Sequence, residues 1–148
     1  MEVHPDFKNL FELFNAHKVE YMIVGGYALA FHGAPRYTGD IDIFINSNFE
    51  NAKRIMDALI EFGFGSVGLS ESDFIDEDKI IQLGVPPVRI DILTSISGVA
   101  WQDAFPNCAA GHYGNVDVKY IGLKDFIENK KSIGRKKDEA DLEALGQV

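Results

Sequence analysis

The sequence lacks the features that define several large classes of protein. Its 148 residues include one cysteine, Cys108, which excludes an internal disulfide framework and suits a reducing compartment. No apolar run approaches the roughly 20 residues of a membrane-spanning helix. The first ten residues, MEVHPDFKNL, have neither the basic start nor the apolar stretch of a secretion signal. We therefore expect a cytoplasmic protein without membrane contact.

Positive charge is scarce as well. Lysine and arginine total 14 against 23 aspartates and glutamates, which gives a net charge of −9. Binding along a long nucleic acid requires a basic surface, so this charge argues against such a partner. It leaves room for a small basic site, because five of the 14 basic residues fall between Lys130 and Lys137.

The chain shows no repeat, low-complexity tract or linker, and its length and 46% apolar content predict a single domain over residues 1–148. Hydrophobic spacing predicts a helix from Pro5, another from about residue 47, and two more near 123–133 and 137–145. The second has the form of a capping box, with Ser47 as N-cap and the Glu50 side chain bonding back to the N-cap backbone. Five strands are expected near 21–24, 40–45, 79–83, 88–93 and 113–121, with a turn at 84–87. This interleaving predicts an α/β (α+β) fold, a mixed and mostly antiparallel sheet of about five strands packed by helices.

Two of these strands carry aspartates in otherwise apolar surroundings. In GDIDIFIN, Asp40 and Asp42 share one face of the strand and the isoleucines share the other, because side chains alternate. In VRIDIL, Asp91 stands opposite its neighbouring isoleucines and on the same side as Arg89. If the two strands are neighbours, three carboxylates meet on one patch, which oxygen-seeking Mg²⁺ would neutralise. The plain alternative is that these acids lie on a solvated face.

A glycine pair makes the metal interpretation more specific. Gly25 and Gly26 follow a buried strand directly and precede a short helix. Glycines in that position let backbone N–H groups approach a phosphate. A Gly-Gly turn 13 residues before an Asp-x-Asp strand, with a later strand aspartate, is a more specific pattern than any of its parts.

Together these motifs resemble the nucleotidyltransferase superfamily with the polymerase-β-type palm, in particular the minimal nucleotidyltransferases of toxin–antitoxin systems and the AbiEii-like proteins. Arg36 and Thr38 match the Arg-x-Thr that precedes the acid pair in AbiEii-like members. The segment KKSIGRKKDEADLEAL resembles their C-terminal motif, onto which these residues fall: Lys130, Gly134, Arg135, Lys137, Asp138 and Asp141. One departure is Gly26, where many active members carry serine.

The resemblance implies transfer of a nucleoside monophosphate from a nucleoside triphosphate, ATP among them, to an acceptor hydroxyl. Asp40, Asp42 and Asp91 would be the catalytic and metal-binding residues for Mg²⁺ or Mn²⁺. The triphosphate would be held by Gly25, Gly26, Arg36, Thr38, Lys130, Arg135 and Lys137.

Several alternatives stay open at this stage. Arg36 is equally compatible with a structural pair to an aspartate, and Asp138 and Asp141 are expected to fix helix packing rather than bind metal. The acceptor could be a protein, a tRNA end or a small molecule. The protein could also act as an antitoxin that binds a toxin partner, or as a nucleotide sensor without turnover.

Overall fold

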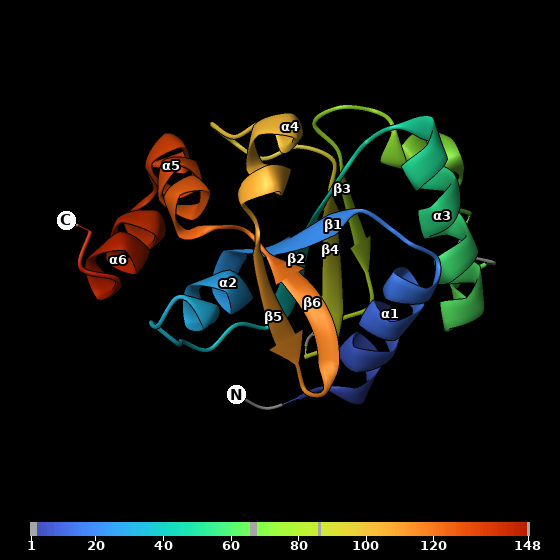
Figure 1. Ribbon diagram of the computed structural model, residues 1–148, viewed down its shortest axis with the longest axis horizontal. Helices are drawn as coiled ribbons and strands as arrows, with labels where there is room; N and C mark the ends of the chain where they lie inside the picture. Colours follow the sequence, from blue (N-terminus) through green and yellow to red (C-terminus); the bar gives the residue numbers. More distant parts are fainter. Residues whose placement is uncertain (1–2, 66–67, 86, 148) are drawn as a thin grey trace.

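The computed structural model describes residues 3–65, 68–85 and 87–147, and its centre is a six-stranded mixed sheet. The strands lie in the order β3-β4-β2-β1-β6-β5 (Figure 1). Their bounds are β1 Tyr21–Val24, β2 Asp40–Ile45, β3 Ile80–Leu83, β4 Arg89–Leu93, β5 Ala109–Tyr113 and β6 Val116–Tyr120. Three pairings are antiparallel (β1/β2, β3/β4 and β5/β6) and two are parallel (β2/β4 and β1/β6). The mixed, mostly antiparallel sheet predicted from the sequence is thereby confirmed.

The sequence predicts one strand too few. The stretch around Gly114 is a full hairpin, in which β5 pairs with β6 from Ala109↔Tyr120 to Tyr113↔Val116. The alternation in VDVKY indicates β6 clearly, whereas β5, with the sequence AAGHY, offers little apolar periodicity to detect. Of the predicted turn at 84–87, Pro86 lies outside the described residues.

The helices gather in two groups around the sheet. Helices α1 (Pro5–Ala16) and α3 (Phe49–Leu59) lie together at one end of the molecule, and α5 (Leu123–Ile133) and α6 (Lys136–Ala144) lie at the other end beside α2 (Gly25–Phe31) (Figure 1). A short helix, α4 (Trp101–Ala104), and three single turns at Ile60–Phe64, Glu71–Phe74 and Phe105–Asn107 complete the elements. Across the described residues, none of the helices combines the length and the apolar character that crossing a membrane requires.

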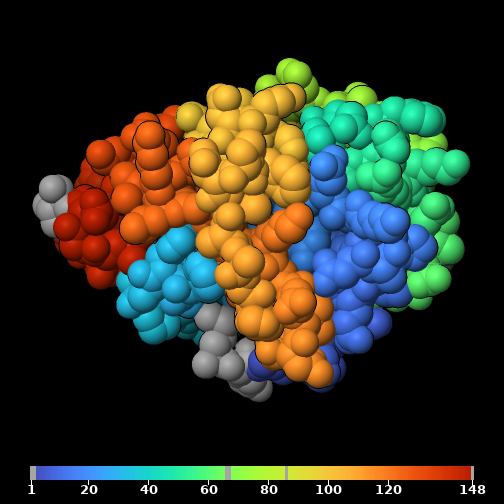
Figure 2. Space-filling view, viewed as in Figure 1, coloured from blue at the N-terminus to red at the C-terminus, as the bar shows by residue number. Residues whose placement is uncertain are grey.

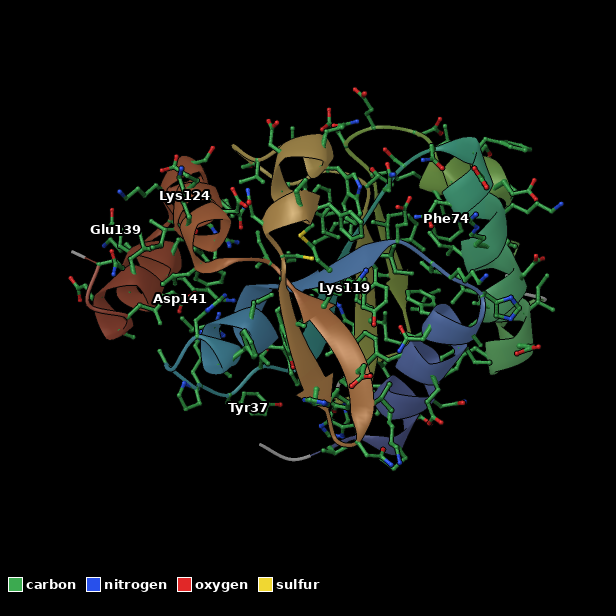
Figure 3. The ribbon with its side chains drawn as sticks, viewed as in Figure 1. Tyr37, Phe74, Lys119, Lys124, Glu139 and Asp141 are labelled. Atoms are coloured by element: carbon green, nitrogen blue, oxygen red, sulfur yellow. The ribbon has the colours of Figure 1, made fainter. Side chains whose placement is uncertain are left out.

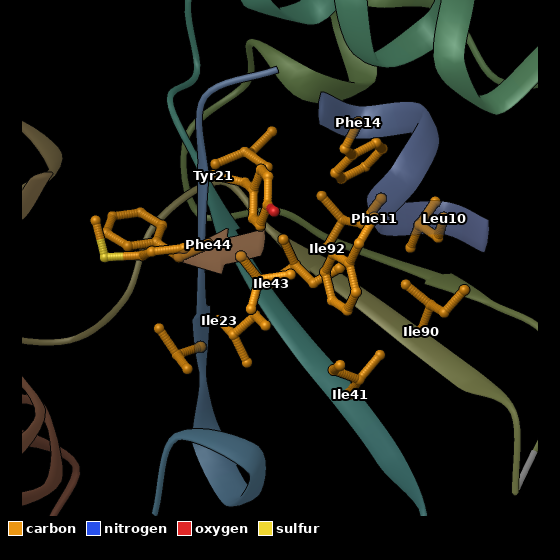
Figure 4. Close-up of a cluster of buried hydrophobic side chains, with 14 of the residues drawn as sticks. Leu10, Phe11, Phe14, Tyr21, Ile23, Ile41, Ile43, Phe44, Ile90 and Ile92 are labelled. Carbon is orange, nitrogen blue, oxygen red and sulfur yellow. The ribbon is translucent and has the colours of Figure 1, made fainter. Parts of the chain in front are cut away.

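The isoleucine faces of β2 and β4 form the core, as the strand alternation predicts. Ile41, Ile43, Ile90 and Ile92 are all at most 1% exposed, and helix α1 covers them with Leu10, Phe11 and Phe14 (Figure 4). The helix presents these residues because their spacing places them on one side. Burying this face of the sheet leaves the aspartates of the same strands on the other.

The predicted start of α3 is wrong by one residue. The N-cap is Asn48, whose Oδ1 accepts from the backbone N–H of Asn51 at 2.8 Å, rather than Ser47. Asn51 is fully buried, because its side chain bonds to the backbone of Glu20 and Asn46 at the adjoining ends of β1 and β2. This anchoring turns Ala52, Ile55 and Leu59 inward and leaves Phe49 65% exposed.

Candidate functional site

The parallel pairing of β2 with β4 brings the three strand aspartates together. In this register Asp42 lies opposite Asp91, and Asp40 lies opposite Arg89. One carboxylate oxygen from each of Asp40, Asp42 and Asp91 can be chosen such that all three lie within 4.8 Å of one another. We call these three residues the carboxylate site. Residues 49 apart in the chain thus form one acidic patch on a rigid sheet.

The carboxylate site brings like charges together, which disfavours the ionised form of Asp42. The pKa of Asp42 is raised to about 7, first by burial and then by the neighbouring charges of Asp40 and Asp91. Thr38 fixes Asp40 in place, since its hydroxyl donates to Asp40 Oδ1 at 3.1 Å and to the Asp40 carbonyl at 3.0 Å. Clustered, partly buried carboxylate oxygens form a donor set that Mg²⁺ or Mn²⁺ prefers, so these residues fit such an ion.

The glycine turn packs directly on this site. Gly25 has a φ of +67°, and a Cβ there would lie 2.2 Å from Asp42 Oδ2, so no side chain fits. A Cβ on Gly26 would lie 3.0 Å from the Cβ of Thr38. The Thr38 side chain therefore occupies the space into which a serine at position 26 would project.

Beside the carboxylate site lies a second group of charged residues, the α5–α6 charge network (Arg36, Lys130, Arg135, Asp138 and Asp141). Lys130 Nζ lies 3.1 Å from a carboxylate oxygen of Asp138 and 3.1 Å from one of Asp141, and all three side chains are at most 5% exposed. Arg135 donates to both oxygens of Asp138, at 2.7 and 3.2 Å. Burial opposes ionisation of Asp138, but hydrogen bonds from Arg135 and Lys130 outweigh it and bring its pKa to about 2.

Arg36 joins this network to the loop before β2. Its Nε and Nη2 donate to the two carboxylate oxygens of Asp141 at 2.9 and 3.2 Å. Asp141 lies on the side of α6 that faces α2 (Figure 3), and the two segments meet at the surface (Figure 2). Of the two roles expected for Arg36, the structure thus has the pair with an aspartate.

A cavity of about 460 Å³ opens over the carboxylate site. The predicted site residues that line it are Gly25, Asp40, Asp42, Asp91, Lys130, Arg135 and Lys137. Gly26, Arg36 and Thr38 are not among its lining residues. Thr38 packs against Gly26 and bonds to Asp40, whereas Arg36 bonds to Asp141 of the α5–α6 charge network. One wall of the cavity, from α5 and α6, is therefore cationic, and its floor is acidic.

Sequence reasoning missed two parts of this cavity. The first is Arg89, which donates from Nε and Nη2 to the two oxygens of Asp91, both at 2.9 Å. Its position on the same strand face, two residues before Asp91, is the signal that could have identified it. The second is a smaller hollow of about 230 Å³ that adjoins the cavity, because five residues line both: Ile80, Leu93, Ser95, Ile96 and Ser97.

Comparison with solved structures identifies the fold as that of nucleotidyltransferases. TM1012 from Thermotoga maritima, provisionally described as a nucleotidyltransferase, aligns over 99% of this chain and 97% of its own, with a TM-score of 0.61 and 18% identity. An antigenic nucleotidyltransferase-like protein from Paracoccidioides brasiliensis aligns over 95% of this chain and 72% of its own (TM-score 0.60, 19% identity). The lincosamide antibiotic adenylyltransferase LnuA, solved with lincomycin bound, aligns over 100% and 99% (TM-score 0.57, 14% identity).

At such low identity these likenesses establish the fold alone. Membership of the superfamily indicated by the motifs, and of its AbiEii-like branch, stays a prediction. No protein-family model and no curated protein sequence matches the chain.

Proposed function

We propose that the protein is a divalent-metal-dependent nucleotidyltransferase, which moves a nucleoside monophosphate from a nucleoside triphosphate to an acceptor hydroxyl. The observation that carries this proposal is the carboxylate site, in which Asp40, Asp42 and Asp91 converge within 4.8 Å at the floor of a cavity with a cationic wall. The nucleotidyltransferase fold of its structural neighbours supports the same reaction class.

The carboxylates have distinct parts in this reaction. Asp40 and Asp42 would hold Mg²⁺ or Mn²⁺ against the phosphates, where the ion supplies neutralisation of the developing charge. Asp91 would complete the metal site and take the proton of the acceptor hydroxyl. The acceptor oxygen bonds to the α-phosphorus, the bond between the α-phosphorus and the bridging oxygen breaks, and pyrophosphate leaves.

The cationic wall is the place for the triphosphate. Lys137 and Arg135 would contact it, and Lys130 would add charge from its buried position. The backbone N–H groups of Gly25 and Gly26 would approach the phosphates at the turn. Arg36 and Thr38 would act indirectly, because their own hydrogen bonds go to Asp141 and to Asp40.

The adjoining hollow favours a small acceptor over a tRNA end. Three apolar side chains and two serines line it together with Asp78 and Lys79, and Asp78 accepts from Ser95 Oγ at 2.7 Å. The exposed carboxylates of Asp76 and Glu77 precede Asp78, while Lys79 is paired with Asp73. Such a border repels a polyanion, so we propose a hydroxylated small molecule that is neutral or cationic. LnuA, a structural neighbour that was solved with lincomycin bound, supports this proposal.

The toxin–antitoxin setting and the antitoxin role stay hypotheses from the sequence. None of the three neighbours named above is described as a toxin or an antitoxin. Purification with a second, tightly bound small protein would favour a binding role.

The test is transfer of label. Purified protein, Mg²⁺ and each of the four α-labelled nucleoside triphosphates are incubated with cell lysate, with Asp42→Asn as the control. We expect label in a new product with the wild type alone, in the fraction that passes a small-pore filter. Label in RNA or protein would overturn the acceptor class only. Absence of transfer together with absence of triphosphate binding would overturn the reaction class.

A further inference from the structure

Arg89 places a positive charge where a metal ion would have to bind. Its guanidinium is bonded to both carboxylate oxygens of Asp91, and its Nη2 lies 4.0 Å from Asp40 Oδ2. Asp91 itself is almost buried, with 8% of its side chain exposed. A divalent ion that used Asp91 would therefore meet a cation already paired with the same carboxylate, and the two like charges would repel each other.

The Arg89 guanidinium is also able to move away from Asp91. About a third of the Arg89 side chain is exposed, and its ion pairs in the described part of the chain go to Asp40 and Asp91 alone. Lys130, by contrast, is 5% exposed and lies between two buried aspartates. Of these two cations that line the cavity, Arg89 is thus the one that can exchange its partner without itself becoming a buried, unpaired charge, and a divalent ion would take over its place at Asp91.

We propose that Arg89 is a resident counter-cation, which competes with the divalent ion for Asp91 and transfers to the triphosphate when metal and nucleotide bind together. This inference rests on the proposed function. A phosphate offers the planar guanidinium the same two-pronged pairing as a carboxylate, so the exchange replaces one such pair by another. The consequence is coupling: metal alone binds weakly, and each of metal and triphosphate strengthens binding of the other.

The test measures binding directly rather than turnover. Mn²⁺ affinity is determined by electron paramagnetic resonance for the wild type and Arg89→Gln, with and without a non-hydrolysable triphosphate analogue. We expect Arg89→Gln to bind Mn²⁺ alone roughly tenfold more tightly and to lose most of the strengthening by the analogue, within the range usual for coupled sites. Arg89→Lys keeps the charge but loses the two-point pairing of the guanidinium, so its Mn²⁺ affinity should lie between those of the wild type and Arg89→Gln.

Two controls make the outcome decisive. Arg54→Gln removes an exposed arginine that pairs with Glu50 on α3, away from the cavity, and should leave Mn²⁺ affinity unchanged. Thermal unfolding establishes that each variant is folded. Unchanged or weaker Mn²⁺ binding by both Arg89 variants would overturn the counter-cation and leave the nucleotidyltransferase intact, because Arg89 would then merely orient Asp91. If no protein binds Mn²⁺ even with the analogue, the proposed function fails as well.

Discussion

Two clusters of charged side chains lie side by side in this protein, and they differ in charge balance. In the α5–α6 charge network, two carboxylates are matched by three cations, and buried Lys130 contacts both acids. In the carboxylate site, the ion pairs among the described residues match three carboxylates with Arg89 alone. Buried charges that all have partners of the opposite sign fasten elements together, whereas an excess of unpaired charge of one sign on a rigid scaffold indicates a missing ligand of the other sign.

The pKa values make the same distinction. The pKa of Asp138 is lowered to about 2, because hydrogen bonds from Arg135 and Lys130 overcome its burial. The pKa of Asp42 is raised to about 7, because burial and the charges of Asp40 and Asp91 act in the same direction. The two clusters should therefore respond in opposite ways when an acid is removed, and the predictions below use that difference.

The largest effect on stability is expected from replacing Asp138. Replacement by alanine removes the buried partner that Lys130 and Arg135 share, although Lys130 keeps Asp141 and Arg135 is exposed. We therefore expect a loss of about 3 kcal/mol of unfolding free energy, the lower end of the range for a broken buried pair. The matched control is Glu139→Ala, at an exposed position on the same helix (Figure 3), expected within about 0.5 kcal/mol of the wild type. Urea unfolding of the wild type, Asp138→Ala and Glu139→Ala measures both changes in stability. Equal stability of the two variants would show that the network does not hold α6 in place.

Replacement of Asp42 by asparagine should instead raise the free energy of unfolding when the protein is free of metal. The pKa of Asp42 is higher in the folded protein than the 3.8 of the unfolded chain, so the wild type loses stability as the pH rises through about 7. The asparagine variant should be more stable by roughly 2 kcal/mol at pH 8 in EDTA, and the gap should close below about pH 4. Unfolding measured from pH 4 to 8 tests this, and added Mg²⁺ should stabilise the wild type alone. A variant less stable than the wild type at pH 8 would contradict the charge imbalance.

A smaller effect is expected where the glycine turn meets the carboxylate site. Gly25→Ala combines backbone strain at φ +67° with a side chain 2.2 Å from Asp42 Oδ2, so it should cost about 1–2 kcal/mol and displace that carboxylate. Gly68→Ala is the matched control, because Gly68 has φ +81° with open space around its Cβ position. Mn²⁺ affinity should fall in Gly25→Ala only. Retained affinity would mean that the turn is not part of the site.

Much of this arrangement can be predicted from the sequence, for local reasons. Strand alternation places Asp40 and Asp42 on one face, the helical spacing of Leu10 and Phe14 predicts the covering helix, and Gly134 marks the break between α5 and α6. These features depend on neighbours in the chain. The carboxylate site needs only one long-range fact beyond them, the pairing of β2 with β4.

What the sequence leaves open depends on contacts between distant segments. Arg36 and Asp141 are 105 residues apart, so composition gives no reason to pair that arginine with an aspartate rather than a phosphate. The choice of Asn48 over Ser47 as N-cap follows from the anchoring of Asn51 at the ends of β1 and β2. The role of Thr38 likewise appears only when its side chain is seen over Gly26.

The smallest effect should come from Lys137, and it sharpens the comparison because Lys137 belongs to neither cluster. It lines the cavity, and no ion pair is recorded for it within the described residues, so its charge is available to a triphosphate. Lys137→Gln should raise the KM for the nucleotide by about 3–5-fold and leave kcat and stability unchanged, because an exposed ion pair is worth about 1 kcal/mol at most.

The neighbour of Lys137, Lys136, does not line the cavity, so Lys136→Gln is the control and should behave as the wild type. Added salt should narrow the difference between Lys137→Gln and the wild type, since exposed charges are screened. If both lysine variants raise KM equally, the nucleotide responds to the overall charge of α6 and not to the wall of the cavity.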